Sequence, residues 1–349
     1  MQKITYVSAG NDGHRSEYDR LFNRIFQEAR FQVDYVIDAD QSPEHTNLLF
    51  YSMIDTVPGQ TFSSLIRTIA RSILGRKTVG LFFRPGDCIY ATGLKYKIKK
   101  MLFRITAHLP HVSILTILPF EICPDFSKIA TNGIYDPQLW DLQYLGASTD
   151  GAPDLQRQIV TAAQGRRIVI ALGGQNYSKG FDCMVDLWCS SSEVRDSFLF
   201  VATGKVSADS LGKARQFEQN SGFLLNRFID NNELFALYQL ADIVWSCYAP
   251  QYNQASGIYG RAVQLGVPVV VREGSYLEKL GEMIGHPTLA LGFDDPHKAA
   301  DNLLAWYPSP TDEETLAKMV TKMREHSLAI LAKAIGAAHP TEHAHTAPP

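Results

Sequence analysis

Ala171-Leu-Gly-Gly-Gln-Asn-Tyr-Ser-Lys-Gly180 begins within the apolar run Arg167–Leu172 and continues as a loop of small and polar residues. Tyr252-Asn-Gln-Ala-Ser-Gly-Ile-Tyr-Gly-Arg261 has the same character and leads into Gly266-Val-Pro-Val-Val270. Each stretch predicts a buried strand, a tight loop and a helix. Such a loop presents backbone N–H groups at a helix N-terminus, which suits an anion such as a diphosphate. Two of these loops in one half of the chain predict a single nucleotide site in one domain.

Short apolar runs alternate with helical patterns along the chain, which predicts an α/β fold with parallel sheets covered by helices. In the first half, strands are expected over residues 4–8, 33–37, 47–51, 88–91 and 112–118, with a helix over 17–29. In the second half, strands are expected over 167–172, 198–202, 222–225, 243–247 and 267–271. Helices are expected between those strands, over 181–189, 208–220, 232–240 and 257–265.

Two domains are expected, because 349 residues are long for one core. The predicted first domain covers residues 1–150 and the second covers 151–335, with a linker at 148–154. Residues 338–349 are predicted to be a disordered tail. The tail histidines can bind a metal, although a tail without a bound metal is the simpler interpretation: His339, His343 and His345.

Composition narrows the class of protein. The chain is 45% apolar and 20% charged, which is typical of a soluble globular protein, and its net charge of −3 gives no general case for nucleic-acid binding. No apolar run approaches the length of about 18–20 residues that a spanning helix needs. Five scattered cysteines without a C-x-x-C pair favour reduced thiols in the cytosol over disulfides or zinc. A strand directly at the N-terminus argues against a secretory signal.

One region carries a strong positive bias. Between Ile66 and Arg104 there are ten Lys and Arg residues and one acid, Asp87, so the formal balance is 10 − 1 = +9. Apolar residues recur there at helical spacing: Leu65, Ile66, Ile69, Ile73, Leu74, Leu94, Ile98, Met101 and Leu102. Two interpretations follow. The region is a basic amphipathic surface for peripheral contact with an anionic membrane, or it is a solvated charged face over an apolar stripe that packs in the core.

Several motifs of the second half occur in the order found in family-4-type glycosyltransferases of the GT-B fold. They are Asn132-Gly-Ile-Tyr-Asp136, Gly173-Gly-Gln-Asn-Tyr-Ser-Lys-Gly180, Phe200-Val-Ala-Thr-Gly204, the segment 228–242 and Arg261-Ala-Val-Gln-Leu-Gly-Val-Pro-Val-Val270. The chain therefore resembles that family over residues 130–285. The resemblance implies two Rossmann-like domains whose parallel sheets face a central cleft. It further implies an N-terminal acceptor-binding domain and a C-terminal domain that binds the nucleotide-sugar donor.

The chain departs from the family at three positions. Asn253 and Arg261 stand where the family has the two acids of its Glu-x7-Glu motif, and Gly174 stands where it has an arginine. These departures indicate a divergent family with the same fold, so retention of anomeric configuration is not implied.

The resemblance places donor-binding residues in the second domain. Lys179 is expected to stabilise the leaving diphosphate, or else it is a surface lysine at a helix start. Ser256 and Gly257 can hold the diphosphate or serve only as a helix cap. Arg261 can reach the phosphates or ribose, or pair with Glu273. Tyr252 can line the sugar pocket or be a packed tyrosine. The loop residues expected beside the nucleotide are Gly174, Gln175, Asn176 and Gly204, with Arg227, Phe228 and Ile229 beside the base.

The loop after the first strand offers a general base for the acceptor hydroxyl in an inverting reaction. The candidates are Asp12, His14 and Glu17, with Glu121 as a weaker one; Asp12 can instead cap a helix. No metal or other cofactor is expected beyond the nucleotide-sugar substrate, a UDP- or GDP-sugar. No Gly-x-Gly-x-x-Gly follows the first strand, which disfavours a nicotinamide enzyme.

The expected function is a cytoplasmic, metal-independent hexosyltransferase in polysaccharide or glycoconjugate biosynthesis. It would move a sugar to a glycan or lipid-linked glycan, and it would have no nucleic-acid partner. Two alternatives remain open at this stage. One is a nucleotide-sugar 2-epimerase of the same fold, which would act without an acceptor. The other is a catalytically silent subunit that partners another transferase, an idea motivated by the missing acids at Asn253 and Arg261.

Overall fold

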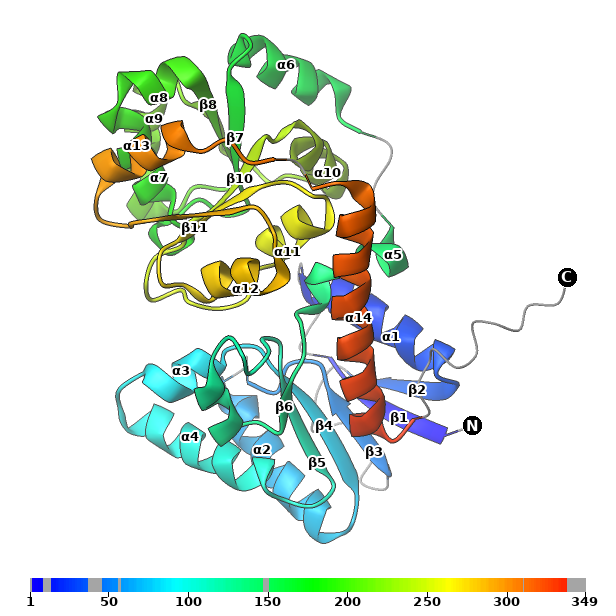
Figure 1. Cartoon of the computed structure of the whole chain (residues 1–349). Coiled ribbons are helices and arrows are strands. Elements are labelled where there is room, and N and C mark those ends of the chain that lie inside the picture. Colours follow the sequence, from blue (N-terminus) through cyan, green and yellow to red (C-terminus); the bar gives the residue numbers. More distant parts are fainter. Residues whose placement is uncertain are drawn as a thin grey trace, which may run out of the picture. The chain divides into compact units, whose positions relative to one another are not determined.

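A computed structural model describes residues 2–8, 14–36, 46–55, 58–146, 151–309 and 311–337 (Figure 1). The chain divides into two compact units, Met1–Leu145 with Thr321–Pro349, and Gly146–Val320. Each unit has one six-stranded parallel sheet with helices, which confirms the predicted α/β class. Within the described ranges, no helix combines the length and the hydrophobicity that a membrane crossing requires.

The sheet of the first unit has the strand order β2-β1-β3-β4-β5-β6. Its strands are β1 Gln2–Val7, β2 Phe31–Val36, β3 Leu48–Tyr51, β4 Lys77–Phe82, β5 Val112–Thr116 and β6 Asn132–Gly133. Its helices include α1 His14–Glu28, α2 Pro58–Ile73, α3 Pro85–Tyr90, α4 Leu94–Ala107 and α5 Leu142–Leu145. Because the strands are parallel, their carboxyl ends lie along one edge of this sheet.

One expected strand of the first unit is wrong. Residues 88–91 lie mostly in helix α3, whereas the strand of this region is β4, which the sequence pattern did not predict. Pro85 occupies the first turn of α3 and Asp87 follows it, and both residues suit a helix start. The run Cys88-Ile-Tyr-Ala is too short for periodicity to separate strand from helix. The other expected strands agree with β1, β2, β3 and β5 to within two residues wherever the structure describes them.

The sheet of the second unit has the strand order β12-β11-β10-β7-β8-β9. Its strands are β7 Arg167–Leu172, β8 Phe198–Thr203, β9 Phe223–Leu225, β10 Ile243–Ser246, β11 Val269–Arg272 and β12 Thr288–Leu291. Its helices are α6 Pro153–Ala163, α7 Phe181–Ser190, α8 Ser192–Ser197, α9 Leu211–Gln219, α10 Asn231–Leu240, α11 Gly257–Gln264, α12 Tyr276–Ile284 and α13 Pro296–Ala305. Five of the six strands were predicted to within two residues.

Two segments near the unit boundaries differ from the sequence interpretation. The linker expected at 148–154 ends inside α6, which begins at Pro153; residues 147–150 lie outside the described part of the chain. The long helix α14, Glu313–Ile335, starts in the second unit, but from Thr321 onward it belongs to the first. Ser327 on this helix accepts a hydrogen bond from the backbone N–H of Tyr135 at 3.1 Å. The expected tail, 338–349, lies outside the described residues.

The core of the second unit is aromatic and lies directly beneath the loops described below. Trp188 packs on Phe200 with ring centroids 5.1 Å apart, and Phe200 packs on Trp245 at 6.2 Å. The indole N–H of Trp245 donates to the carbonyl of Gly180 at 3.2 Å. A buried indole needs a hydrogen-bond partner. This contact therefore holds the Gly180 loop against the core. The cysteines of the chain are all free thiols.

Candidate functional site

Five loops at the carboxyl edge of the second sheet are joined by hydrogen bonds into one structure. We call it the carboxyl-edge rim and define it as residues 173–180, 204–207, 226–230, 247–256 and 272–275. The loops after β7 and β8 are joined because Gln175 N donates to Lys205 O and Ser207 N donates to Gln175 O, both at 2.9 Å. Val206 N donates to Asn226 Oδ1 at 2.9 Å, which joins the loop after β9 to the loop after β8.

Two further contacts extend the rim in the other direction along the sheet. Ala249 N donates to Ser178 O at 3.1 Å, which joins the loops after β7 and β10. Arg272 Nε donates to Tyr248 O at 3.1 Å, which joins the loop after β11. In open α/β sheets, ligands bind outside the carboxyl ends of the strands. The rim is therefore the part of this unit where a ligand site is expected, and its loops are held in fixed positions.

Two glycines of the rim are required by its backbone geometry. Gly204 has φ = 122°, and a Cβ at this position would lie 2.0 Å from Gly173 O. Gly180 has φ = 75°, and a Cβ would lie 1.9 Å from Cys247 O. No side chain fits at these distances, so the two glycines allow neighbouring loops to approach each other closely. Gly204 was predicted as a donor-site residue, and the structure gives it this backbone role.

The side chains of Gln175 and Asn176 shape the first loop. Gln175 is buried, and its Nε2 donates to Gly173 O at 2.9 Å and to Thr203 O at 3.0 Å. Asn176 Oδ1 accepts from Lys179 N at 3.0 Å and so caps the short turn Tyr177–Lys179. Any contribution of these two residues to nucleotide binding is therefore through the loop that they hold. Gly174 is exposed, and a Cβ there meets no atom closer than 3.7 Å.

Lys179 is held by two aromatic rings. Its ammonium Nζ lies 4.5 Å from the ring centroid of Tyr248 and 4.3 Å from that of Tyr252. The two rings are perpendicular, with centroids 5.4 Å apart. Both distances are within the range of a cation–π interaction, which restricts the ammonium without neutralising its charge. The structure thus brings together two residues, Lys179 and Tyr252, that the sequence proposed separately.

Tyr248 connects the Lys179 ammonium to the start of helix α11. Its buried hydroxyl lies 2.8 Å from Ser256 Oγ, and Ser256 Oγ accepts from Tyr259 N at 3.4 Å as the N-cap of α11. Gly257 is the first residue of that helix. The N-terminus of α11, which is the positive end of the helix dipole, is therefore hydrogen-bonded to Tyr248. The ring of the same tyrosine contacts the Lys179 ammonium. Tyr248 and Arg272 were not predicted; the only sequence signal was an aromatic four residues before Tyr252.

The two positions that depart from the family's acids have different surroundings. Asn253 Oδ1 accepts from Tyr276 N at 2.8 Å and so ties the loop after β10 to the start of α12. Arg261 is buried within α11, with its guanidinium carbon 5.9 Å from the ring centroid of Phe235. Asn253 therefore contributes to the loop structure of the rim, and Arg261 places a cationic group one turn into the helix that starts at the rim.

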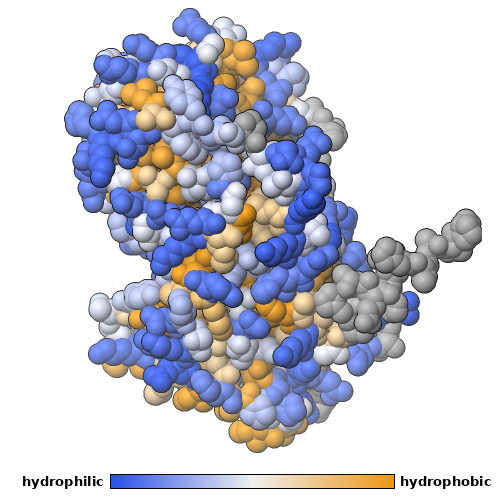
Figure 2. Space-filling view, viewed as in Figure 1, coloured by the Kyte–Doolittle hydropathy of each residue, from blue (hydrophilic) through white to orange (hydrophobic). Residues whose placement is uncertain are grey.

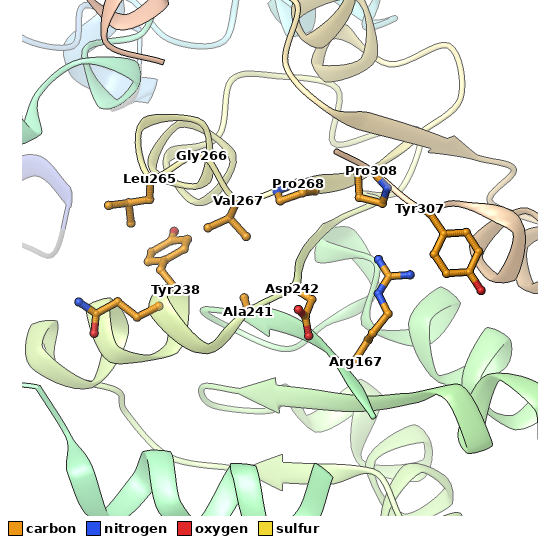
Figure 3. Close-up of a pocket in the computed structure, with 11 residues that line it drawn as sticks. Arg167, Tyr238, Ala241, Asp242, Leu265, Gly266, Val267, Pro268, Tyr307 and Pro308 are labelled. Carbon is orange, nitrogen blue, oxygen red and sulfur yellow. The ribbon is translucent and has the colours of Figure 1, made fainter. Parts of the chain in front are cut away.

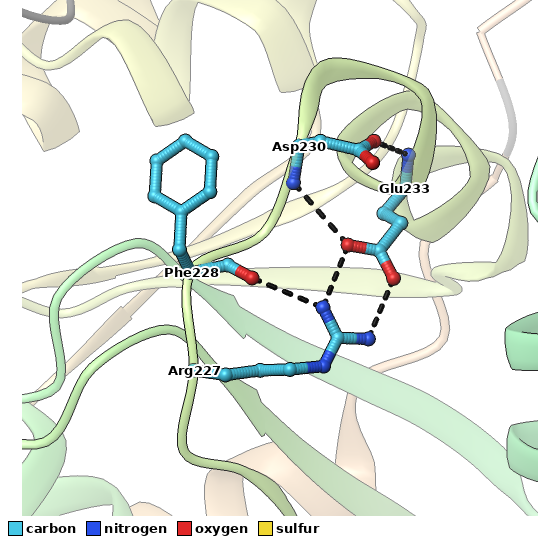
Figure 4. A network of polar contacts seen from close by, with 4 residues as sticks. All are labelled: Arg227, Phe228, Asp230 and Glu233. Atoms are coloured by element: carbon cyan, nitrogen blue, oxygen red, sulfur yellow. Dashed lines mark hydrogen bonds and ion pairs between the residues drawn. The ribbon is translucent and has the colours of Figure 1, made fainter.

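The loop after β9 is stabilised by an ion pair (Figure 4). Arg227 donates to both carboxylate oxygens of Glu233, at 2.6 and 2.8 Å, and to Phe228 O at 3.0 Å. Asp230 and Glu233 form a capping box at the start of α10. Phe228 is 75% exposed, and Ile229 is half-buried. Arg227 is thus engaged with its own loop, while Phe228 presents an uncovered aromatic face at the rim.

The candidates of the first unit are only partly described. Asp12 lies outside the described residues, and His14 opens helix α1, although its side chain is not among those described. Glu17 is half-buried and accepts from Gln138 Nε2 at 3.4 Å. Glu121 is exposed after β5. The structure therefore leaves their predicted role as general base untested.

A buried carboxylate that the sequence did not single out lies on α1. Asp19 accepts hydrogen bonds from the hydroxyls of Tyr6 at 2.7 Å, Ser8 at 2.6 Å, and Tyr35. Burial, followed by the bond to Asp19, raises the pKa of Tyr35 to about 12, so this hydroxyl remains a donor. These three bonds satisfy the carboxylate and fix α1 against β1 and β2. No local sequence pattern could have shown this, because the donors come from separate segments.

A cavity of about 460 Å³ lies at the opposite edge of the second sheet (Figure 3). Arg167 begins β7, Asp242 directly precedes β10, and Pro268 directly precedes β11, so these lining residues mark the amino edge. Asp242 Oδ2 accepts from Ile168 N at 2.7 Å, and Arg167 donates to Trp306 O at 3.0 Å. Arg167 and Asp242 are thus engaged in joining strands and helices, and the cavity is separate from the rim.

Among the residues that the structure describes, no group of three or more His, Cys, Asp or Glu side chains is placed to hold a metal ion.

A buried histidine, His286, packs against Tyr259 of helix α11, and its protonation should lower the free energy of unfolding. His286 is buried; its ring nitrogen Nε2 lies 3.0 Å from Val267 O, and its ring packs edge-on to Tyr259. Burial lowers the pKa of His286 to about 4. In the unfolded chain a histidine has a pKa of about 6.5, so the unfolded state binds more protons between these values. The stabilising contribution is complete above about pH 6.5 and is lost as the pH falls toward 4.

We therefore expect His286→Gln to reduce the acid sensitivity of the second unit. Between pH 7 and pH 5 the wild-type histidine should cost about 2 kcal/mol of unfolding free energy, and glutamine, which does not titrate, should remove that loss. Melting temperatures at the two pH values, measured for both proteins, check this. If the drop in melting temperature is the same in both, His286 does not titrate as described.

Comparison with known proteins establishes the fold. No family model matches the chain, and no curated protein matches its sequence. A sucrose-phosphate synthase from Thermosynechococcus elongatus is 12% identical, with a TM-score of 0.58 over 96% of each chain. HepE from Anabaena, solved in complex with UDP and glucose, is 13% identical, with a TM-score of 0.58 over 96% of each chain.

A third solved structure has a different described activity. A putative UDP-N-acetylglucosamine 2-epimerase from Listeria monocytogenes is 12% identical, with a TM-score of 0.58, covering 95% of this chain and 96% of that chain. The chain therefore has the GT-B fold, as its sequence motifs predicted. At these identities the similarity defines the fold, and the reaction must be argued from the rim.

Proposed function

We propose that this protein is a glycosyltransferase that transfers a sugar from a nucleoside-diphosphate sugar to a glycan or lipid-linked glycan. The donor site is the carboxyl-edge rim of the second unit. One observation carries the proposal: the Lys179 ammonium is held over Tyr248 and Tyr252, in the same cluster as the N-terminus of α11. A fixed cation beside a helix N-terminus is the arrangement that a leaving diphosphate requires.

The chemistry follows from where charge develops. As the bond between the anomeric carbon and the diphosphate oxygen breaks, the electron pair stays on that oxygen, and negative charge increases on the β-phosphate. Lys179 and the first-turn N–H groups at Ser256 and Gly257 would stabilise this charge, and such stabilisation needs no metal ion. Arg261 lies one turn further into the helix and would favour the same anion.

The nucleoside would lie at the loop after β9. Phe228 offers an exposed aromatic face for a base, and the backbone of Arg227 and Ile229 offers hydrogen-bonding groups. UDP and GDP are the preferred donor nucleotides in this proposal, and UDP is the nucleotide in the HepE complex. Asp12, His14 and Glu17 of the first unit remain the proposed source of the base for the acceptor hydroxyl.

A 2-epimerase is the second candidate function, because one structure of similar fold is described as a putative enzyme of that kind. An epimerase changes the sugar without an acceptor, whereas a transferase releases nucleoside diphosphate when its acceptor is present. The catalytically silent subunit is the third candidate. It would bind no nucleotide, although the fixed cation at Lys179 argues for a retained anion site.

A thermal-shift panel with UDP, GDP, CMP, dTDP and ADP, with and without magnesium, tests the proposal. A ligand that binds only the folded state raises the melting temperature by mass action. We expect one nucleoside diphosphate to give a clear shift without magnesium, and we expect Lys179→Ala to remove that shift. Absence of a shift with every nucleotide would favour the silent subunit.

A further inference from the structure

Helix α4 in the first unit exposes apolar residues on the face that points away from the core. Its buried positions are Lys99, Phe103 and Thr106. The exposed positions on the opposite side are apolar and follow a spacing of three or four residues: Leu94 at 73%, Ile98 at 39%, Met101 at 54% and Ile105 at 44% exposed. Residues at this spacing share one helix face. The apolar stripe of α4 is therefore a surface ridge and does not pack in the core.

Helix α2, which packs against α4, repeats this pattern. Leu65, Thr68 and Ser72 face the core, while Ile66, Ile73 and Leu74 are 62%, 79% and 63% exposed. In Figure 2, hydrophobic side chains gather along the lower edge of the first unit, in the area that α2 and α4 occupy in Figure 1. We name these seven residues the apolar ridge; six lie in the two helices, and Leu74 directly follows α2. Of the two interpretations of this region, the one with a core-packed apolar stripe is wrong for these positions.

Basic groups border the apolar ridge. Lys95, Lys97 and Arg104 of α4 are exposed, and Arg67 and Lys100 are half-buried beside them. The stretch from Ile66 to Arg104 contains one acid, Asp87. The surface thus combines aliphatic side chains with several basic groups, on a stretch of sequence that has a single acid. A folded protein partner with such a face would need both an apolar and an acidic surface, whereas an anionic bilayer supplies both.

We propose that the apolar ridge and its basic border bind the surface of an anionic phospholipid membrane. The exposed Ile, Leu and Met side chains enter the acyl boundary, and the Lys and Arg groups contact lipid phosphates. The helices lie along the surface and do not cross it. This assignment is independent of the proposed sugar transfer, because it uses no residue of the rim.

Vesicle sedimentation of the full chain tests the assignment. The probes are phosphatidylcholine vesicles with and without about 30 mol% phosphatidylglycerol, at about 0.1 and 0.5 M NaCl. We expect binding to the anionic vesicles only, and weaker binding at high salt. Equal binding to both vesicle types, or binding to neither, would overturn the proposal.

Matched variants separate the two parts of the surface. The apolar variant Ile73→Gln/Leu94→Gln/Met101→Gln should lower the vesicle partition coefficient at least about tenfold. The basic variant Lys95→Gln/Lys97→Gln/Arg104→Gln should lower it about fivefold per charge and reduce its salt dependence. The control Val160→Gln/Lys279→Gln changes an exposed apolar residue and an exposed lysine of the second unit and should bind as the wild type does.

Two results would contradict the assignment to a membrane. One is unchanged vesicle binding in both the apolar and the basic variant, with melting temperatures that show both to be folded. The other is a wild-type oligomer in solution that the apolar variant dissociates, since this would make the ridge a contact between protein chains. Nucleotide shifts measured on the same variants should equal those of the wild type, so failure here is distinguishable from failure of the proposed donor site.

Discussion

Lys179→Ala should lower kcat/KM for sugar transfer by about a hundred- to a thousandfold, because it removes the one cation that two tyrosine rings hold at the rim. The loss should appear mainly in kcat, since charge on the diphosphate is greatest in the transition state. The loss of stability should be small, about 1 kcal/mol or less, because cation–π contacts of a partly exposed lysine contribute about that much. Transfer rates with the identified donor, together with melting temperatures, measure both effects.

Two controls distinguish charge from packing at this position. Lys179→Arg keeps a cation near the rings and should retain part of the activity. Lys279→Ala removes an exposed lysine of α12 in the same unit and should leave transfer unchanged. Activity of Lys179→Ala within threefold of the wild type, with a specified donor bound, would remove Lys179 from the mechanism.

Gly204→Ala and Gly180→Ala should each destabilise the second unit by at least about 3 kcal/mol. A Cβ at these positions would lie 2.0 Å from Gly173 O and 1.9 Å from Cys247 O, respectively. Both obstructing atoms are backbone carbonyl oxygens, so no side-chain rotation relieves the overlap, and the positive φ angles add strain. Melting temperature and the yield of folded protein measure the effect, and nucleotide binding should be lost with the rim geometry.

Gly212→Ala and Gly174→Ala are the matched controls. A Cβ at Gly212 in α9 meets no atom within 4 Å, and one at Gly174 meets nothing closer than 3.7 Å. Gly212→Ala should be neutral or slightly stabilising because alanine favours a helix, and Gly174→Ala should fold normally. If Gly204→Ala and Gly180→Ala have the same melting temperatures as these controls, the close approach between the rim loops is not as described.

The second unit was predictable because four of its parallel strands, β7, β8, β10 and β11, are almost wholly buried and read as continuous apolar runs. The expected strand 167–172 agrees with β7, and 198–202 agrees with β8 to within one residue. The motif Gly173–Gly180 was predicted to follow a strand, and it lies at the carboxyl end of β7, where parallel strands bring their carboxyl ends together. The positions of Lys179 and Ser256 on that edge follow from these two facts.

The remaining features depend on contacts that a sequence does not show. Periodicity predicts an apolar face on α4, but it does not say whether that face packs or is exposed; the burial of Lys99 and Phe103 decides it. The two rings around Lys179 come from the loop after another strand. The division of α14 between units depends on contacts such as that between Ser327 and Tyr135. Each of these features is set by tertiary packing between distant segments.

Calorimetric titration of UDP and GDP into the wild type, Lys179→Ala and Lys279→Ala tests the central claim most directly. We expect one nucleoside diphosphate to bind the wild type and Lys279→Ala with equal affinity, and to bind Lys179→Ala at least about tenfold more weakly, a difference of about 1.4 kcal/mol. Equal affinity in all three proteins, or no binding of either nucleotide to the wild type, would contradict the assignment of the carboxyl-edge rim as the donor site.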